Sequence, residues 1–512
     1  MRTTNSIKNI YMSIVTQVVI ILLGFLSRKV FLDNLGTEYL GVNGLLTNII
    51  SMLSLVEGGI GTSIVYNLYK PLADNDIPKI TALIQLYKKI YSIIAVIVFA
   101  LSLVTYPLVK LSMKNGETIP YISIVYFIFV IRNVISYLNA HKWSLIYADQ
   151  KNYILAKYNL IFNIITTICK IIVLSATKNY ILFLLIEVVI FIVQNIYNGN
   201  IVNKMYPYIK TKDKYVVGED VKNNLITNVK ALFLHNVGTY CVMGTDNLLI
   251  GMLINLKSVG LYSNYSMVIG QLSSVFTQVL GGIGASVGNL IATETKEKSY
   301  EVFKVTYFIN FLIYSIVVTF LYNLLEPFID WWLREGLLLD KLTFIVLLIN
   351  FYITGLRQSI GTFKSRAGIF SQDKYIPLIE SIINLVASIV LAKRFGIVGI
   401  FIGTTISSLA LPVWIQSKLV YNEVFGKSVL EYFKKYIFYI ILTLLTCIIT
   451  TFICKQIVIQ AMFISLVIKG IISITIPGLI YILIFYKTDE FKYVLNMVRP
   501  IIYKVHSKLV GV

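Results

Sequence analysis

Two stretches near the end of the chain decide its class. Residues 438–453 read FYIILTLLTCIITTFI, and residues 471–486 read IISITIPGLIYILIFY. Neither stretch contains a charged side chain, and each approaches the length of about 20 residues that an α-helix needs to cross a bilayer. Polar and apolar residues do not alternate, as they would in a transmembrane β-strand. Because backbone groups in lipid must be satisfied within the segment, these stretches predict transmembrane helices.

Similar apolar runs recur along all 512 residues, of which 57% are hydrophobic and only 14% are charged. Soluble globular proteins carry about 25% charged residues, so the composition indicates an integral membrane protein. We expect an all-α fold of about fourteen transmembrane helices. The expected spans are 10–32, 39–68, 89–110, 119–141, 154–174, 180–200, 228–254, 261–291, 304–325, 341–362, 376–395, 398–421, 436–454 and 463–486.

The distribution of positive charge orients this scheme. Most of the 45 lysines and arginines fall in alternate connecting segments, namely 1–9, 70–89, 142–157, 204–230, 296–304, 357–374, 418–435 and 487–508. Positively charged loops stay in the cytoplasm, so both termini are expected there, in the bacterial inner (plasma) membrane. The net charge of +20 is then a sign of membrane topology rather than of nucleic-acid binding. The apolar stretch after Arg2 and Lys8 runs on without a small-residue cleavage site, so we expect an uncleaved first span rather than a signal peptide.

The two halves of the chain echo each other. Residues 58–63 (GGIGTS) resemble residues 281–286 (GGIGAS), and Arg132 followed by 147–151 (YADQK) resembles Arg357 followed by 370–374 (FSQDK). Two echoes in the same order favour a duplication, with parallel repeats related by a pseudo-twofold axis along the membrane normal. The expected parts are an N-terminal six-helix lobe at 1–203, a cytoplasmic linker at 204–227, a second six-helix lobe at 228–425, and two extra helices with a cytoplasmic tail at 426–512.

Catalytic and metal-binding motifs are missing from the sequence. The three histidines, at 141, 235 and 506, form no metal-ligand pattern, and no phosphate-binding loop or nucleophile motif is present. We therefore expect a transporter rather than an enzyme, without a cofactor.

Charged residues within the spans are the candidate functional groups, because a charge at membrane depth is costly unless it faces protein or water. The basic candidates suit a phosphate or diphosphate in a cavity, and the acidic ones suit a coupling Na⁺ or H⁺, although local pairing and snorkelling to the interface are simpler alternatives. The basic candidates are Arg28, Lys29, Arg132, Lys170 and Arg357. The acidic candidates are Glu57, Asp246, Glu187 and Glu380. Small residues that allow bending or close helix packing are Gly58, Gly59, Gly61, Gly281, Gly282 and Gly284.

Several segments, taken in order, resemble a known family. They are 23–28 (LGFLSR), 34–41 (NLGTEYLG), 55–61 (LVEGGIG), 69–73 (YKPLA), 148–151 (ADQK) and 395–400 (FGIVGI). The chain resembles polysaccharide flippases of the Wzx type, within the superfamily that also holds MATE exporters and lipid II flippases. The resemblance covers most of residues 7–425.

The resemblance implies a MATE-like fold and a flippase that moves an undecaprenyl-diphosphate-linked oligosaccharide to the outer leaflet by alternating access. The product would enter O-antigen or capsule, so a polysaccharide polymerase and glycosyltransferases are expected partners. Arg28 and Glu57 match charged cavity positions of lipid II flippases, but Lys29 stands where an acidic residue is common.

Other classes stay open. A cation-coupled drug exporter of the same superfamily needs an acidic cavity, whereas these candidates lean basic. A membrane polysaccharide polymerase needs a substantial outer loop with catalytic residues, and no such loop is present. An amino-acid or ion transporter would need helices broken at mid-span, which the glycines near 58–61 and 281–284 permit.

Overall fold

The chain is described from a computed structural model that covers residues 2–57, 60–111, 119–211, 213–215, 217–218, 244–369, 372–496 and 499. The described residues form helices and connecting segments and contain no strand. Contacts divide the chain into two compact units, Met1–Ser263 and Asn264–Val512. The lobe boundaries expected from the sequence are not tested by this division and stay a prediction.

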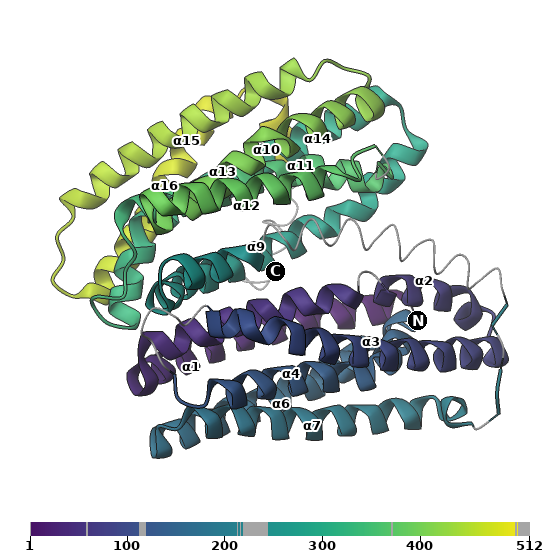
Figure 1. Cartoon of the computed structure of the whole chain (residues 1–512). Helices are drawn as coiled ribbons and strands as arrows, with labels where there is room; N and C mark the ends of the chain where they lie inside the picture. Colours follow the sequence, from purple (N-terminus) through teal and green to yellow (C-terminus); the bar gives the residue numbers. More distant parts are fainter. Residues whose placement is uncertain are drawn as a thin grey trace, which may run out of the picture. The chain divides into compact units, whose positions relative to one another are not determined.

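The first unit is built from long helices that run roughly parallel or antiparallel to one another (Figure 1). They are α1 (Arg2–Leu53), α2 (Ile60–Ala73), α3 (Ile77–Leu111), α4 (Ile122–Leu138), α5 (Ala140–Ala148), α6 (Asn152–Thr177) and α7 (Tyr180–Met205), with short 3₁₀ turns at Ser54–Glu57 (η1) and Pro207–Lys210 (η2). Residues 244–253 are also helical, and α9 (Leu256–Thr293) begins in this unit.

The second unit is also built mainly from long helices. Its helices are α10 (Lys296–Trp332), α11 (Lys341–Arg366), α12 (Ile376–Phe395), α13 (Ile397–Ala410), α14 (Pro412–Val420), α15 (Leu430–Gln456) and α16 (Met462–Phe485), with a π-helical turn at Tyr421–Phe425 (η3). Within the described residues, ten helices are long and apolar enough to cross a membrane, or eleven if the bent pair α4 and α5 counts as one span. The chain is therefore an all-α, multi-pass membrane protein, as the sequence predicted.

The expected spans map onto these helices in a way that explains the lower count. The first expected span and the start of the second share α1, which is interrupted at Gly36 (φ 84°, ψ −177°), a conformation that is essentially confined to glycine. The expected span 261–291 lies in α9, and 228–254 falls largely outside the described residues. The pair α4 and α5 bends by 48°.

Close backbone contact holds α12 against α13. A Cβ atom on Gly399 would lie 2.3 Å from the carbonyl oxygen of Leu391, and one on Gly403 would lie 2.5 Å from the backbone nitrogen of Ser388. No larger residue fits at either position without moving the backbone. This is the packing by small residues four apart that drives helix association in lipid.

The last two helices are joined to the second unit by aromatic and hydroxyl contacts. Phe311 of α10 stacks on Tyr439 of α15 with ring centroids 4.0 Å apart. The hydroxyl of Ser315 is hydrogen-bonded to that of Tyr481 on α16, and Thr443 on α15 donates to Ser315 over 2.8 Å. Because the polar groups are buried and paired, α15 and α16 are fixed on α10.

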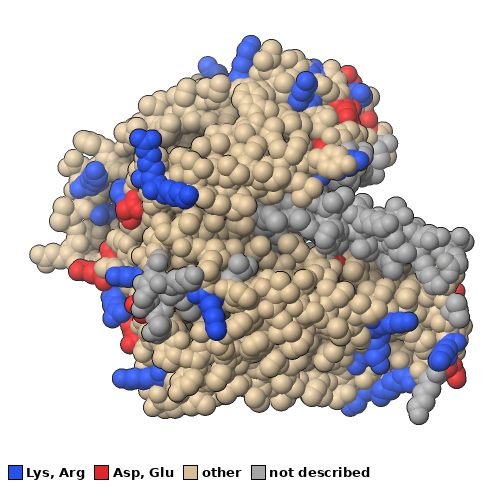
Figure 2. Space-filling view, in the orientation of Figure 1, with Lys and Arg blue, Asp and Glu red and all other residues tan. Residues whose placement is uncertain are grey.

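Charge is distributed along each unit as expected for a membrane protein. Figure 2 shows lysines and arginines gathered near the ends of the helices, with wide areas of uncharged surface between them. Large apolar side chains such as Leu22, Val96, Ile172 and Val390 are 60–68% exposed. Such a surface suits lipid rather than water.

Candidate functional site

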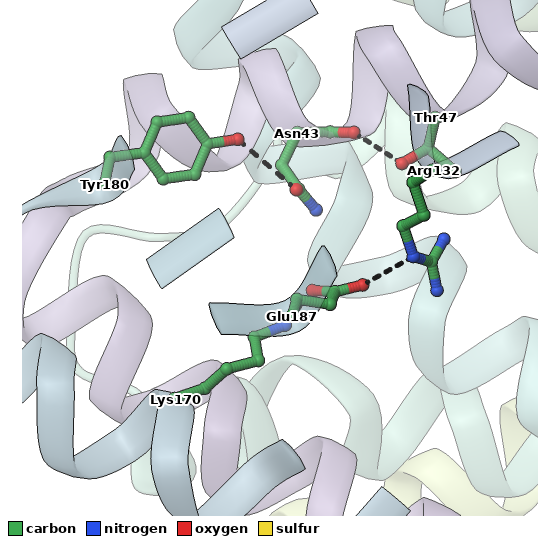
Figure 3. Close-up of polar contacts among 6 residues, drawn as sticks. All are labelled: Asn43, Thr47, Arg132, Lys170, Tyr180 and Glu187. Atoms are coloured by element: carbon green, nitrogen blue, oxygen red, sulfur yellow. Dashed lines mark hydrogen bonds and ion pairs between the residues drawn. The ribbon is translucent and has the colours of Figure 1, made fainter. Parts of the chain in front are cut away.

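Three of the candidate charges meet in the first unit. Glu187 on α7 lies between Arg132 on α4 and Lys170 on α6 (Figure 3). Its Oε1 atom lies 3.2 Å from Nε of Arg132, and its Oε2 atom accepts a hydrogen bond from Nζ of Lys170. We call Arg132, Lys170 and Glu187 the ionic triad. One carboxylate faces two cations, so the triad keeps one net positive charge.

The two cations of the triad differ in how freely they can bind a further anion. The side chain of Lys170 is 17% exposed and its Nζ atom also lies 4.2 Å from the centre of the Phe183 ring. The side chain of Arg132 is 46% exposed; its Nε atom faces Glu187, and its Cζ atom lies 5.2 Å from the centre of the Phe191 ring. Figure 3 shows the two terminal nitrogens of Arg132 directed away from that carboxylate. Arg132 can therefore donate to a further anion while Lys170 is held by Glu187.

Helix α1 contributes polar groups beside the triad. The hydroxyl of Tyr180 donates to Oδ1 of Asn43 over 3.4 Å, and the hydroxyl of Thr47 donates to the backbone oxygen of Asn43 over 2.7 Å (Figure 3). Tyr180 follows Asn179, whose side chain caps the start of α7 by accepting from the backbone nitrogens of residues 181 and 182. The cap fixes the beginning of the helix that carries Glu187.

The second unit holds its arginine in a related way. Nη1 of Arg357 on α11 lies 3.6 Å from Oε1 of Glu380 on α12, and their side chains are 24% and 9% exposed. Arg132 and Arg357, which the sequence echo relates, are thus each paired with a glutamate of their own unit. Local pairing was one interpretation of these charges from the sequence, and the structure shows it for Glu187 and Glu380.

The aspartates in the second part of the echo make different contacts in the two units. Asp149 accepts a hydrogen bond of 2.5 Å from the hydroxyl of Tyr206 and lies 2.7 Å from Nζ of Lys151. Burial, together with the hydrogen bond to Asp149, raises the pKa of Tyr206, so this phenol remains a donor at physiological pH. In the second unit Asp373 pairs with the buried Lys364. Each aspartate ties the loop between two helices to the rest of its unit.

Glu57 forms a separate polar contact at the end of η1, directly after α1. Its Oε1 atom accepts a hydrogen bond of 3.2 Å from the hydroxyl of Tyr91 on α3. A Cβ atom on Gly61 would lie 3.2 Å from both of these oxygen atoms, which is tighter than most real contacts. Gly61 therefore leaves room for the pair of Glu57 and Tyr91, a role that its place in a glycine motif did not reveal.

The remaining candidates are not brought together with the triad. Nη1 of Arg28 on α1 donates to Oγ of Ser263 over 2.8 Å, and no carboxylate pairs with Arg28 among the described residues. Lys29 is exposed. Asp246 is buried.

The other glycines of the motif add little. Gly58 and Gly59 lie outside the described residues, and Gly281, Gly282 and Gly284 lie within the helical run of α9.

Sequence reasoning missed the uncharged partners of these sites. Tyr91, Tyr180 and Asn43 carry no signal in a single sequence, because tyrosine and asparagine are common throughout this chain. The repeated segment 370–374 pointed to Asp373, but not to its partner Lys364, which lies outside that segment on the preceding helix.

Comparison with known proteins defines the fold. No protein-family model matches the sequence, and no curated protein sequence matches it. Among solved structures, the lipid II flippase MurJ in an inward closed conformation aligns with a TM-score of 0.61 and 15% identity, over 95% of this chain and 100% of that chain.

MATE transporters also align. The MATE multidrug transporter DinF-BH gives a TM-score of 0.56 and 16% identity, over 82% of this chain and 95% of that one. An inward-facing MATE family transporter of the MOP superfamily gives 0.55 and 12%, over 78% and 95%. At these identities the similarity defines the fold and not the activity. The chain thus has the MATE-like fold shared by these MOP superfamily transporters and the lipid II flippase.

Proposed function

We propose that this protein is a flippase that moves an undecaprenyl-diphosphate-linked oligosaccharide from the inner to the outer leaflet of the bacterial plasma membrane. The observation that carries the proposal is the alignment with a lipid II flippase along 95% of this chain and the whole of the other. The MATE transporters quoted above align over 78% and 82% of this chain. The organisation of the full chain therefore favours a lipid-linked substrate over a small cationic drug.

The charges at membrane depth support an anionic substrate. Arg28 has no carboxylate partner among the described residues, and Arg132 keeps two terminal nitrogens free of Glu187. Guanidinium groups bind phosphate oxygens through paired, charge-assisted hydrogen bonds. A diphosphate carries the charge that these groups would neutralise, whereas a cationic drug would be repelled.

The proposed mechanism is alternating access. The diphosphate and sugars enter a polar cavity open to the cytoplasm while the lipid chain stays in the bilayer, and the protein then opens outward. Moving one elementary charge across the membrane is worth about 2.3 kcal/mol per 100 mV, so the membrane potential can reset the cycle. Na⁺ or H⁺ coupling through Glu57 or Asp246 is the alternative source of energy.

The proposal places the protein within surface polysaccharide biosynthesis. Glycosyltransferases would supply the lipid-linked repeat unit on the cytoplasmic side, and a polymerase would consume it on the other side, for O-antigen or capsule. Both termini of the protein would lie in the cytoplasm.

Deletion in the native host tests the proposal. We expect a complete, unpolymerised repeat unit to accumulate on its lipid, on the cytoplasmic side, and surface glycan to fall. Normal surface glycan together with raised sensitivity to cationic drugs would refute the proposal and favour a cation-coupled drug exporter.

Point variants of Arg28 then test the chemistry. Arg28→Ala should insert at normal levels yet fail to restore glycan export to the deletion strain, and Arg28→Lys should restore it in part because it keeps the charge but loses the planar fork. Full export by Arg28→Ala would contradict the cationic cavity.

A further inference from the structure

A groove in the second unit is lined mainly by apolar side chains. It has a volume of about 690 Å³, and its walls come from α10, α11, α13 and α15. All four helices belong to the second unit, so the groove is a feature of that unit alone. On α15 the lining residues are 436, 440, 443, 444, 447, 448, 451, 452 and 455. Because steps of three and four residues fall on one face of a helix, one face of α15 follows the groove.

The α15 side of the groove is open at the surface. Leu444, Ile448 and Phe452 are 57%, 66% and 65% exposed. They stand at intervals of four residues on a helix that is long and apolar enough to cross the membrane. These side chains therefore face hydrocarbon, and an occupant of the groove has to be apolar along this wall.

Hydrogen bonds join the walls of the groove. The hydroxyl of Tyr352 on α11 donates to the backbone oxygen of Tyr439 on α15 over 3.1 Å and lies 2.8 Å from the hydroxyl oxygen of Thr443. Thr405 on α13 donates to Oδ1 of Asn350 on α11 over 2.7 Å. The hydroxyls of Tyr352, Thr443 and Thr405 thus have partners within the protein, so a hydrocarbon chain can lie over them without leaving them unsatisfied.

One end of the groove carries a positive charge. Lys455 is the one charged residue among those that line the groove. It is exposed near the end of α15, and no ion pair joins it to a carboxylate in the described part of the chain. Helix α15 begins in the segment 418–435, which the charge distribution places in the cytoplasm, so Lys455 is predicted to lie at the outer surface.

The length of the groove matches the bilayer. A rise of 1.5 Å per residue puts the Cα atoms of Tyr436 and Lys455 about 28 Å apart along α15. The hydrocarbon core of a bilayer is about 30 Å thick. With Lys455 at the level of the outer headgroups, the groove runs from there through the hydrocarbon, as does a chain that hangs from an outer headgroup.

We propose that this groove binds a hydrocarbon chain of an anionic phospholipid of the outer leaflet, whose phosphate accepts a hydrogen bond from Lys455. Lipid tails are as apolar as the groove, so contact with the chain alone favours no lipid over another. The charge-assisted hydrogen bond to Lys455 then supplies the selection of the headgroup. The proposal does not depend on the transported substrate.

Photocrosslinking of the full chain in liposomes tests the groove. The probe is phosphatidylglycerol with a diazirine in one acyl chain, and phosphatidylcholine with the same label is the zwitterionic comparison. Peptide mass spectrometry should locate the phosphatidylglycerol crosslinks on the groove face of α15. Lys455→Gln should reduce these crosslinks about tenfold, as expected when a hydrogen bond between charged groups is lost, and Lys455→Arg should retain them.

Matched variants separate this site from general attraction to lipid. Ile448→Trp places a ring in the groove and should displace the probe, whereas Ile449→Trp changes an exposed neighbour that does not line the groove and should not. Lys178→Gln removes an exposed lysine at the predicted outer end of α6. Because Lys178 does not line the groove, the crosslinks on α15 should be unchanged in this variant.

Three results would overturn the proposal. Equal crosslinking of α15 by the two labelled lipids, or by phosphatidylglycerol in wild type and Lys455→Gln, would mean that Lys455 selects no headgroup. Unchanged crosslinking in Ile448→Trp would place the chain outside the groove. Displacement of the probe by an equimolar amount of undecaprenyl diphosphate would assign the groove to a polyprenyl chain instead.

Discussion

Replacing Glu187 with glutamine perturbs the ionic triad with the least change in shape. In Glu187→Gln, Lys170 loses its charge-assisted hydrogen bond and faces Arg132 without a carboxylate between them. Removing one partner of a buried ion pair costs about 3–5 kcal/mol. The side chain of Arg132 is 46% exposed, so water screens its share of the loss, and we expect about 2–3 kcal/mol in the free energy of unfolding.

The assay is equilibrium unfolding of the purified protein by SDS in mixed micelles, followed by circular dichroism. Adding Lys170→Met to Glu187→Gln should recover most of the lost stability, because the uncompensated buried cation is then gone. The control is Glu301→Gln, which breaks an exposed ion pair with Lys298 and should leave stability unchanged. If Glu187→Gln unfolds within about 0.5 kcal/mol of wild type, as surface substitutions do, the triad does not hold α4, α6 and α7 together and the reasoning fails.

Other parts of the chain give three more predictions. Gly61→Ala should reduce both stability and glycan export because the new methyl group meets two oxygen atoms at 3.2 Å. Gly270→Ala, whose methyl group meets nothing within 4 Å, should instead raise helix stability by about 0.5–1 kcal/mol. Equal melting temperatures for the two variants would contradict this prediction. Burial raises the pKa of Glu490, but the hydrogen bond and the charge of Lys435 lower it by more, so the pKa of Glu490 lies below 4.5. The contact between Lys435 and Glu490 should therefore stabilise the protein above pH 4.5. This stabilisation should be lost as the pH falls through the lowered pKa. Glu490→Gln should therefore flatten the acid side of the stability profile, and an unchanged profile would count against the contact. Arg357→Met should destabilise the second unit by leaving Glu380 without its cation, an effect that thermal unfolding detects and that Glu380→Gln in the same chain should relieve.

The helices could be predicted from the sequence because hydrophobic runs of this length have few other stable forms. Gly36 lies between two expected spans and so marks the break in α1, although only the structure shows its backbone conformation. The number of spans differs partly because the two helices that meet at the kink at Gly36 count as one in α1, and partly because residues 228–254 fall largely outside the described residues.

The candidate charges could be located but their partners could not. Arg132, Lys170 and Glu187 stand on three different helices, and their meeting depends on how each helix is rotated, which apolar periodicity fixes poorly when lipid and protein are both apolar. The sequence echo marked Arg132 and Arg357 as equivalent. It gave no hint that each faces a glutamate, because those glutamates do not lie in the repeated segments.

The central claim is that the protein moves a lipid-linked oligosaccharide between leaflets, and reconstitution tests it most directly. The purified protein would be incorporated into liposomes that contain the host's lipid-linked oligosaccharide, and a membrane-impermeant glycan-oxidising reagent would be added outside. With wild-type protein we expect oxidation to proceed past the outer-leaflet fraction toward completion, while Arg28→Ala stops near that fraction. The same time course in wild-type and protein-free liposomes, under an imposed membrane potential and Na⁺ or H⁺ gradients, would contradict the account.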